Sequence, residues 1–430
     1  MDNWKQRLGG PMKAVGFVLA LNVFFVAIKL LGAFKGIGSG MGEAMMAELA
    51  TRPMVGLLLG VLVTSIIQSS STTTSLVVGL AASGVFGDDP VTAMQAAVPL
   101  IMGANIGTTV TNTIVSFGHI GDNQEFRRAF SAATVHDVFN LMTVAVLLPL
   151  QVMTNFIGLA AVAAAEFLND IGGLKLASPL KLVVDPQAKA IAALFNHAAL
   201  VDFTVILALV VGALAALGYL ERRQRNGSTS VLPVAAVACF ISFVGLGVRL
   251  YHPIVFSKPT AVFLAGLALL LGALALMVTI MRSVVLARVQ RVFRTYVFKT
   301  TPRAMALGLV LTALVQSSSV TTSLIVPLAG AGLVTLAQVF PFALGANLGT
   351  TVTALMAALS LGDPIALAVA LAHLLFNLCG IIALYPLRRI PLATARFLAE
   401  MAARWPVFPV AYVLGLYVFL PLGLIWLFSD

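Results

Sequence analysis

The chain has 430 residues, of which 60% are hydrophobic and only 10% are charged, and its mean hydropathy is +1.02. Soluble domains carry roughly 25% charged residues, so this composition excludes a soluble globular protein and predicts a polytopic membrane protein. The net charge of +10 does not indicate nucleic-acid binding. The basic residues form short clusters between apolar segments, which is what the positive-inside rule predicts.

Taken in chain order, several apolar segments are long enough to cross a bilayer, which needs about 20 residues. The predicted spans are 14–34, 91–117, 129–150, 190–219, 231–250, 259–281, 335–361, 364–387 and 406–428. The first has no convincing small-residue cleavage site and is therefore expected to be retained rather than removed as a signal peptide. Four stretches of mixed polarity suit helices that lie in the membrane interface, namely 41–49, 153–168, 282–299 and 389–405.

A polar run interrupts the apolar sequence at residues 68–75, which read QSSSTTTS. The flanking segments, 54–67 and 76–86, are each too short to cross a bilayer. We therefore expect a re-entrant helical hairpin over about 54–86, with its polar end inside the membrane and surrounded by protein or a water-filled cavity. Hydroxyl and amide groups at that depth predict a solute site.

The same pattern occurs again as QSSSVTTS at residues 316–323, which predicts a second hairpin over about 304–334. Other motifs repeat as well. GANIGTTVT at 103–111 matches GANLGTTVT at 345–353, and the spacing H-x-x-F-N occurs at 136–140 and at 373–377. These repeats indicate an internal duplication, and the paired glycines of the GAN segments predict a second helix break in each half.

The predicted fold is an all-α polytopic membrane protein with two inverted-topology repeats, each with a re-entrant helical hairpin and a broken helix. The repeats cover 14–219 and 259–428, and a linker span at 231–250 joins them. A cytoplasmic N-terminus puts every basic cluster inside and the C-terminus outside. Inverted repeats whose broken helices meet around a substrate are typical of secondary transporters.

The polar segments also predict the chemistry of the substrate. Helix starts at serines attract anions, whereas freed carbonyls and hydroxyls suit sodium. Neither polar run contains Lys or Arg, so a bound anion needs co-bound cations. Asp137 lies in an apolar span, which predicts a functional role, and Asn140 shares its helix face. His136 and His373 are expected to be structural and hydrogen-bonded within their own repeat.

The paired QSSS motifs, GANIGTTVTNT ending at Thr113, and EFRRAFSAATVHDVFN at 125–140 together resemble the type II sodium/phosphate cotransporter family over about 50–150 and 300–425. The resemblance implies symport of inorganic phosphate driven by sodium, by alternating access in the plasma (inner) membrane. It also implies electrogenic transport, no chemical step and no cofactor, with sodium as the co-substrate. His119, Ala104 and Ala346 depart from the family pattern.

The expected ligands fall into two groups. The phosphate ligands are Gln68, Ser69, Ser70, Ser71, Gln316, Ser317, Ser318 and Ser319. The sodium ligands are Thr72, Asn105, Thr108, Asp122, Asp137, Asn140, Asn347, Thr350 and Thr353. In the family the acidic residue that matches Asp137 goes with the electrogenic mode.

Several alternatives stay open or are disfavoured. The main alternative is a carrier of another small oxyanion or of a dicarboxylate, or a carrier coupled to protons through His136 and Asp137. A channel is disfavoured because the two hydroxyl clusters are not identical. An enzyme is not expected because the polar runs pair no nucleophile with a base and the chain has no phosphate-binding G-x-x-x-x-G-K-[ST] loop. Both a monomer and a homodimer fit the sequence.

Overall fold

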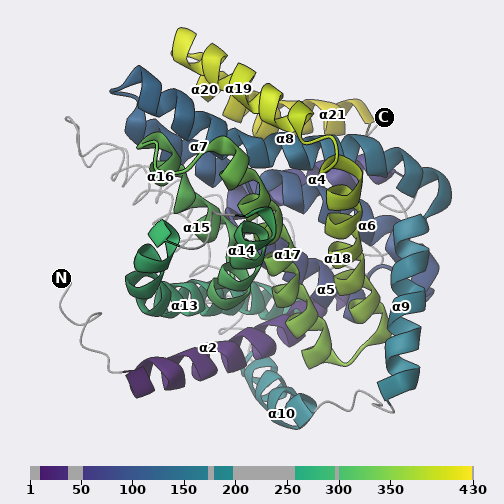
Figure 1. Cartoon of the computed structure of the whole chain (residues 1–430). Coiled ribbons are helices and arrows are strands. Elements are labelled where there is room, and N and C mark those ends of the chain that lie inside the picture. The colour runs from purple at the N-terminus through teal and green to yellow at the C-terminus, as the bar shows by residue number, and fades with distance from the viewer. Residues whose placement is uncertain (1–9, 37–51, 173–178, 197–256, 296–299, 429–430) are drawn as a thin grey trace, which may run out of the picture.

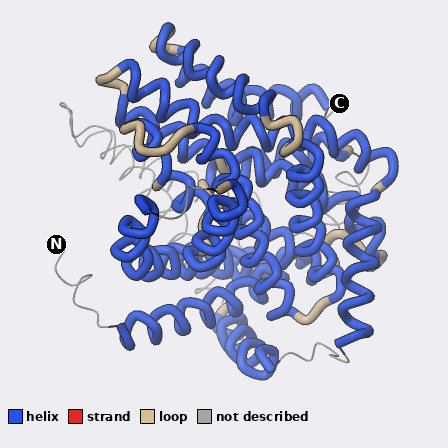
Figure 2. The backbone as a smooth tube through the Cα atoms, viewed as in Figure 1, coloured by secondary structure: helices blue, strands red, loops and turns tan. Residues whose placement is uncertain are grey.

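The structure, a computed structural model, describes residues 10–36, 52–172, 179–196, 257–295 and 300–428. Within these ranges all regular structure is helical (Figures 1 and 2). Among the described residues, six helices are long and apolar enough to cross a membrane: Met12–Phe34, Asn123–Thr154, Lys258–Met281, Leu336–Leu361, Pro364–Leu384 and Phe408–Leu427. The all-helical membrane class predicted from composition is therefore confirmed. The predicted linker span at 231–250, the interface segment at 41–49 and most of 190–219 lie outside the described residues.

The first part of the chain contains these elements: α2 Gly10–Leu31, η1 Gly32–Gly36, α4 Pro53–Ile67, α5 Ser70–Ala82, α6 Pro90–Gly107, α7 Val110–Ser116, η2 Phe117–His119, α8 Asn123–Thr154, α9 Phe156–Gly172 and α10 Pro179–Leu194. The second part contains α13 Lys258–Thr295, α14 Thr301–Val315, α15 Ser318–Ser323, α16 Ile325–Gly330, α17 Leu336–Leu361, α18 Pro364–Leu384, α19 Arg389–Arg404, α20 Phe408–Leu414, the π-helical turn η4 Gly415–Phe419 and α21 Leu420–Phe428.

The prediction of a second helix break in each half is confirmed in the first half and wrong in the second. Residues 108 and 109 separate α6 from α7, whereas α17 runs without interruption through 345–353. Glycine permits a break without forcing one. Thr109 differs from its counterpart in one contact: its hydroxyl lies 2.7 Å from the Tyr417 hydroxyl, while Thr351 donates only to the Leu348 carbonyl of its own helix, at 2.6 Å.

Two boundaries also differ from the prediction. Residues 282–295 continue α13 instead of forming a separate interface helix. The span predicted at 190–219 does not begin at residue 190, because α10 already starts at Pro179 and ends at Leu194. Proline favours the first turn of a helix. An ion pair of 3.3 Å between Lys29 and Asp185 then holds α10 against α2.

The helices pack in an exchanged pattern (Figure 1). In the first half α4 packs on α6, and in the second half α14 packs on α17. The helices that come directly after α4 and α14 in the chain contact the opposite half. Helix α5 packs against α17 and α18, and helices α15 and α16 pack against α7 and α8. Each polar run is therefore enclosed by helices of both halves.

Glycines allow α4 to pack closely against α6 and α14 to pack closely against α17. A Cβ atom on Gly103 would overlap the Leu57 carbonyl oxygen, and one on Gly345 would overlap the Met305 carbonyl oxygen. The obstructing atoms are backbone, so they cannot rotate away. The crossings of α4 with α6 and of α14 with α17 are thus backbone-to-backbone contacts that only glycine allows.

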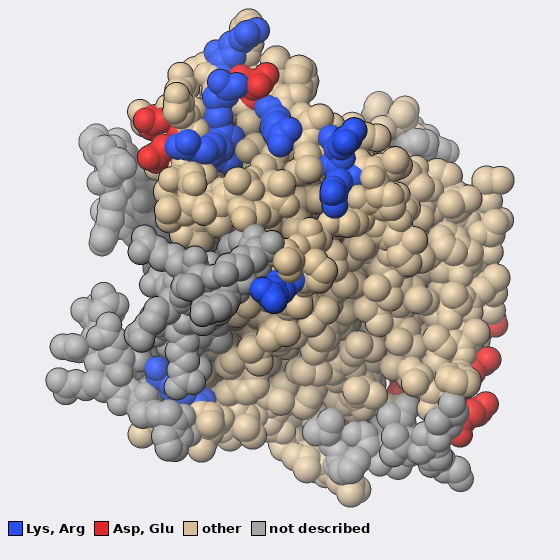
Figure 3. All heavy atoms as spheres, in the orientation of Figure 1, with Lys and Arg blue, Asp and Glu red and all other residues tan. Residues whose placement is uncertain are grey.

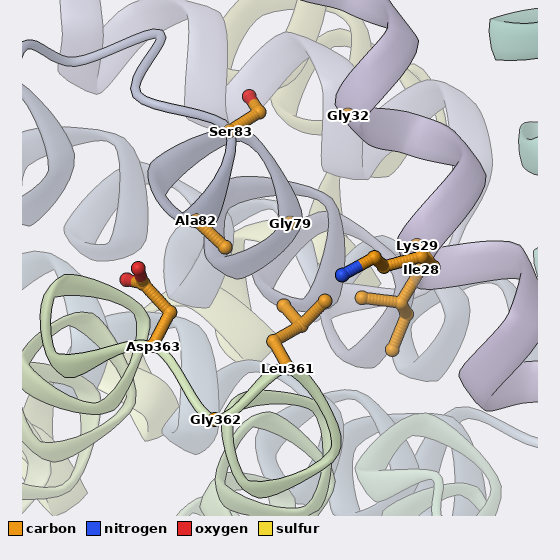
Figure 4. Close-up of a pocket in the computed structure, with 9 residues that line it drawn as sticks. All are labelled: Ile28, Lys29, Gly32, Gly79, Ala82, Ser83, Leu361, Gly362 and Asp363. Carbon is orange, nitrogen blue, oxygen red and sulfur yellow. The ribbon is translucent and has the colours of Figure 1, made fainter. Parts of the chain in front are cut away.

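A cavity of about 240 Å³ lies between α2, α5 and the turn from α17 to α18 (Figure 4). Lys29 and Asp363 lie on opposite walls. Both charges are already used in the structure, because Lys29 pairs with Asp185 and the Asp363 carboxylate accepts a hydrogen bond of 2.9 Å from the Ala366 amide. This cavity therefore marks a contact between the two halves.

Candidate ion and substrate site

Each polar run begins with a glutamine that ends a helix in the left-handed conformation. Gln68 ends α4 with φ of 59°, and Gln316 ends α14 with φ of 60°. A left-handed conformation is unfavourable for a residue with a side chain and is a sign of local strain or function. The same strain therefore occurs at equivalent places in both halves.

The glutamine side chains hold these breaks. The Gln68 Nε2 group donates to the Ser65 carbonyl, and its Oε1 accepts from Thr111 at 2.8 Å. The Gln316 Nε2 group donates to the Ala313 carbonyl, and its Oε1 accepts from Thr353 at 2.6 Å. Each amide thus ties the end of its helix to α7 or α17. One further Nε2 hydrogen on each glutamine remains available to a ligand.

A new helix starts directly after each glutamine. Ser69 caps α5 by accepting from the Thr72 amide at 3.2 Å, and Ser317 caps α15 by accepting from the Val320 amide at 3.3 Å. Residues 68–71 form the first polar tip and residues 316–319 form the second polar tip. Ser70, Ser71, Ser318 and Ser319 are buried in the first turns of these two helices.

The two polar tips contact one another. The Ser71 hydroxyl donates to the Gln316 carbonyl at 3.2 Å. On the other tip, the Ser319 hydroxyl donates at 3.3 Å to the carbonyl of Thr108, at the break between α6 and α7. The two polar tips therefore meet in one buried region, through two residues that are 245 positions apart in the chain.

Two networks of asparagine and histidine connect the halves near this region. Asn347 contacts His136 and Asn140, at 2.5 Å and 2.8 Å. Asn105 contacts His373 and Asn377, each at 3.3 Å. The prediction that both histidines bond within their own repeat is wrong, because each histidine reaches the asparagine of the opposite half. The exchanged packing of the helices accounts for this.

Backbone carbonyls fix the tautomer of both histidines. Asn140 Nδ2 donates to the Asn105 carbonyl, so its Oδ1 accepts from Asn347 and the Asn347 Oδ1 accepts from His136. The hydrogen of the neutral His136 ring must therefore be on Nε2. In the other network Asn377 Nδ2 donates to the His373 carbonyl, so the Asn377 Oδ1 accepts from Asn105 and the Asn105 Oδ1 accepts from His373. The hydrogen of the neutral His373 ring is therefore also on Nε2. The Nδ1 atoms of both rings are buried and have no hydrogen-bond partner within the described residues.

This tautomer predicts different results for two substitutions of His136. Glutamine can place an amide donor where Nε2–H lies, whereas leucine leaves the Asn347 oxygen without a donor. An unsatisfied buried group costs roughly 1–3 kcal/mol, so His136→Leu should lower the thermal unfolding midpoint more than His136→Gln. The same order is expected at His373. Equal midpoints for the glutamine and leucine variants would refute the assignment.

Asp137 lies in a separate buried cluster with two tyrosines. Its Oδ2 accepts a hydrogen bond of 3.3 Å from Tyr412, while its Oδ1 is buried and has no partner within the described residues. Tyr417, which is 1% exposed, lies on η4 and bonds Thr109 at the α6–α7 break. π-helical turns often occur at functional sites. A carboxylate oxygen without a donor, beside a helix break, is suited to a cation.

The other expected sodium ligands lie in varied places. The hydroxyls of Thr108 and Thr350 donate to the carbonyls of Ala104 and Ala346, each at 3.0 Å, and Thr72 donates to Ser69 at 2.9 Å. Asp122 is exposed and caps α8. The Glu125 and Gln124 amides hold the pKa of its carboxyl below the usual value. Within the described residues Asp122 shares no hydrogen bond with the buried clusters.

The sequence reasoning missed four residues of the site: Thr111, Asn112, Tyr412 and Tyr417. Asn112 accepts from Thr322 of the opposite half at 3.0 Å. Thr111 belongs to the repeated GAN segment and matches Thr353, so its repetition was a usable signal, whereas Asn112 follows the segment and matches Ala354. The tyrosines lie in the last span, which is largely exposed, and no pattern in the sequence distinguishes them from interfacial aromatic residues.

The model of a sequence family described as Na+/Pi-cotransporter matches residues 23–177 and 269–385, which is more than half of the chain. The chain belongs to this family. It is 34% identical over 433 residues to sodium-dependent phosphate transport protein 2A of Rattus norvegicus, a match that covers 94% of this chain and 65% of the rat protein.

A further relative is sodium-dependent phosphate transport protein 2B of Homo sapiens, with 33% identity over 448 residues, 94% of this chain and 63% of the human protein. The chain therefore spans less than two thirds of the length of these relatives. No solved structure matches it.

Proposed function

We propose that the chain is a secondary active transporter that moves inorganic phosphate together with sodium across the plasma (inner) membrane, without a chemical step. Membership of the Na+/Pi-cotransporter family and the names of the rat and human relatives support the solutes. The observation that carries the proposal is the contact between the two polar tips through Ser71 and Gln316.

The architecture of this transporter would be two inverted-topology repeats, 14–219 and 259–428, each with a re-entrant hairpin. The equivalent glycine crossings, the equivalent glutamine breaks and the exchanged packing support the duplication. Helices α4 and α14 have only 15 residues each, which is shorter than a bilayer span. Alternating access follows if the two halves exchange roles around the tips. The N-terminus would be cytoplasmic and the C-terminus extracytoplasmic.

Phosphate would bind between the two tips, at the expected ligands Gln68 to Ser71 and Gln316 to Ser319. The helices that begin at Ser70 and Ser318 would offer their first amides and the local dipole to the anion. Within the described residues, no lysine or arginine is buried. The charge of the anion would therefore be balanced by bound sodium, which makes coupling a physical requirement.

Sodium would bind to Asp137 and to oxygens of Thr72, Thr108, Thr350 and Thr353. In Asn105, Asn140 and Asn347 the side-chain oxygen already accepts one hydrogen bond. Each carbonyl oxygen has two lone pairs, so these asparagines can bind sodium only through the second. Their main role would be to hold the two helices that carry the GAN segments.

Sodium dependence of phosphate uptake tests the proposal. Proteoliposomes that contain the purified chain should accumulate labelled phosphate only under an inward sodium gradient. Competition by sulfate and by dicarboxylates, and a proton gradient without sodium, test the alternative carriers. Uptake that does not depend on sodium would contradict the proposal.

Asp137→Asn should separate current from uptake. The amide keeps an acceptor for Tyr412 but removes the negative charge that attracts a cation. We expect phosphate uptake to persist and the current per phosphate to fall to near zero, as measured by electrical recording with parallel tracer flux. An unchanged ratio of current to flux would show that Asp137 does not bind a transported cation.

Tyr417→Phe should weaken sodium binding. The substitution removes the hydroxyl that holds Thr109 at the helix break. Loss of one buried hydrogen bond costs about 1 kcal/mol, which is about a 5-fold rise in the half-saturating sodium concentration. Tyr385→Phe is the matched control, because the Tyr385 hydroxyl bonds only the exposed Arg388 among the described residues. Equal shifts in both variants would argue against the role of Tyr417.

A further inference from the structure

Basic side chains gather at one end of the molecule, over α8 and α19 (Figure 3). Beneath them is a cavity of about 440 Å³ whose lining includes Arg127, Arg128, Arg396 and Glu400. The first two arginines come from the start of α8 and the third from α19. Three guanidinium groups and one carboxylate leave an excess positive charge in a concave space. The positive-inside rule accounts for basic residues at a membrane face, but it does not account for their convergence on one cavity.

Most of the donors in this cavity are free. Arg127 uses one terminal nitrogen on Glu400, at 3.0 Å, and Arg128 uses its Nε on the Gly330 carbonyl, at 2.9 Å. Arg396 is exposed and contacts no acceptor within the described residues. A guanidinium group has five N–H donors. Two or three such groups can therefore bind a phosphate group through paired hydrogen bonds.

The cavity lies beside the end of a candidate membrane span. Helix α8 is long and apolar enough to cross a membrane, and Arg127 and Arg128 lie near its first turn, so the cavity is expected near the membrane surface. Helix α19 is amphipathic: it buries Leu392, Ala395 and Ala399 against α8, whereas Phe397 is 59% exposed beside Arg396. Exposed apolar side chains next to basic residues are typical of helices that lie in the interface. Lipid headgroups thus come within reach of the cavity.

We propose that this cavity is a second anion site, separate from the polar tips, which binds a phosphate group through Arg127, Arg128 and Arg396. A phosphate group at this depth can belong to the headgroup of an anionic lipid or to a free phosphate ion. Arg128 also contacts the turn at Gly330, which ends α16. A ligand in the cavity would therefore connect α8 and α19 to the C-terminal end of α16.

Thermal unfolding of the full chain in neutral detergent at low salt, without sodium, tests the site. Phosphatidic acid should raise the unfolding midpoint of the wild type, and phosphatidylcholine should not. Arg396→Gln should lose most of this rise and Arg396→Lys only part, because lysine keeps the charge without the paired donors. Arg389→Gln, on the same helix but outside the cavity, should keep the full rise.

Free phosphate is the second arm of the same experiment. An Arg396-dependent rise with phosphatidic acid but not with phosphate identifies the lipid headgroup as the ligand, whereas an equal rise with phosphate identifies the free ion. If Arg396→Gln and Arg389→Gln respond alike to both ligands, the site does not exist. The experiment measures binding rather than transport, so its failure is distinct from a failure of the proposed function.

Discussion

Gln316→Ala is expected to abolish phosphate uptake while the protein still folds. Glutamine and alanine both carry a Cβ and pay the same cost for the left-handed conformation, so the variant differs by losing the hydrogen bonds of the amide, among them the one from Thr353, which is worth about 1 kcal/mol. The Gln316 carbonyl, which accepts from Ser71, would no longer be held in place. Because the variant also lacks the amide proposed to bind phosphate, we expect uptake to fall at least about 100-fold, which is about 2.7 kcal/mol in the transport barrier. Uptake per folded molecule in proteoliposomes measures this effect, and Gln68→Ala should behave in the same way.

Two further variants separate the causes. Gln316→Gly keeps the backbone conformation but not the amide, so it should recover part of the folding stability and none of the transport. Asn155→Ala is the control, because Asn155 also has a positive φ, of 50°, but it ends α8 away from the tips. We expect that variant to lose stability and keep its uptake per folded molecule. Normal uptake by Gln316→Ala would remove the glutamine from the mechanism.

Gly345→Ala is expected to have the largest effect on stability. The added methyl group would overlap the Met305 carbonyl oxygen, so α14 and α17 would have to separate. Overpacking in a core costs about 1–3 kcal/mol, and we expect the upper end of this range because the obstacle is backbone. Urea unfolding or the thermal midpoint of the purified protein measures the change. Gly103→Ala should have a similar effect on the crossing of α4 with α6.

The matched control for this prediction is Gly272→Ala in α13. No atom lies within 4 Å of a Cβ built on Gly272. Alanine is favoured over glycine in a helix by up to about 1 kcal/mol, so this variant should be as stable as the wild type or slightly more stable. A Gly345→Ala protein that is as stable as Gly272→Ala would show that the two helices are not in backbone contact.

Much of the fold could be predicted because the lengths of the hydrophobic segments and the repeated motifs can be read directly from the sequence. The six spans of the described residues lie within or close to predicted ones. The breaks at Gln68 and Gln316 follow from polar runs between short apolar arms. The uninterrupted α17 could not be predicted, because the two GAN segments are almost identical in sequence and differ in contacts from distant residues, such as that of Tyr417 with Thr109 and that of Ser319 with Thr108.

The repeated motifs indicated which polar residues to consider together but not how these residues connect in the structure. The serine clusters meet as expected from duplication, through Ser71 and Gln316. His136 and His373 each bond an asparagine of the opposite half. This pairing depends on which helices pack together, and no spacing within one repeat contains that information. The position of Tyr417 depends on a π-helical turn in the last span, which has no sequence signal of its own.

The central claim is that both polar tips bind one phosphate ion together. An experimental structure of the protein with phosphate and sodium present tests this most directly. We predict density for phosphate within hydrogen-bond distance of serines from both tips, 69–71 and 317–319. Density that contacts only one tip, or that occupies only the arginine cavity beside α19, would contradict the claim.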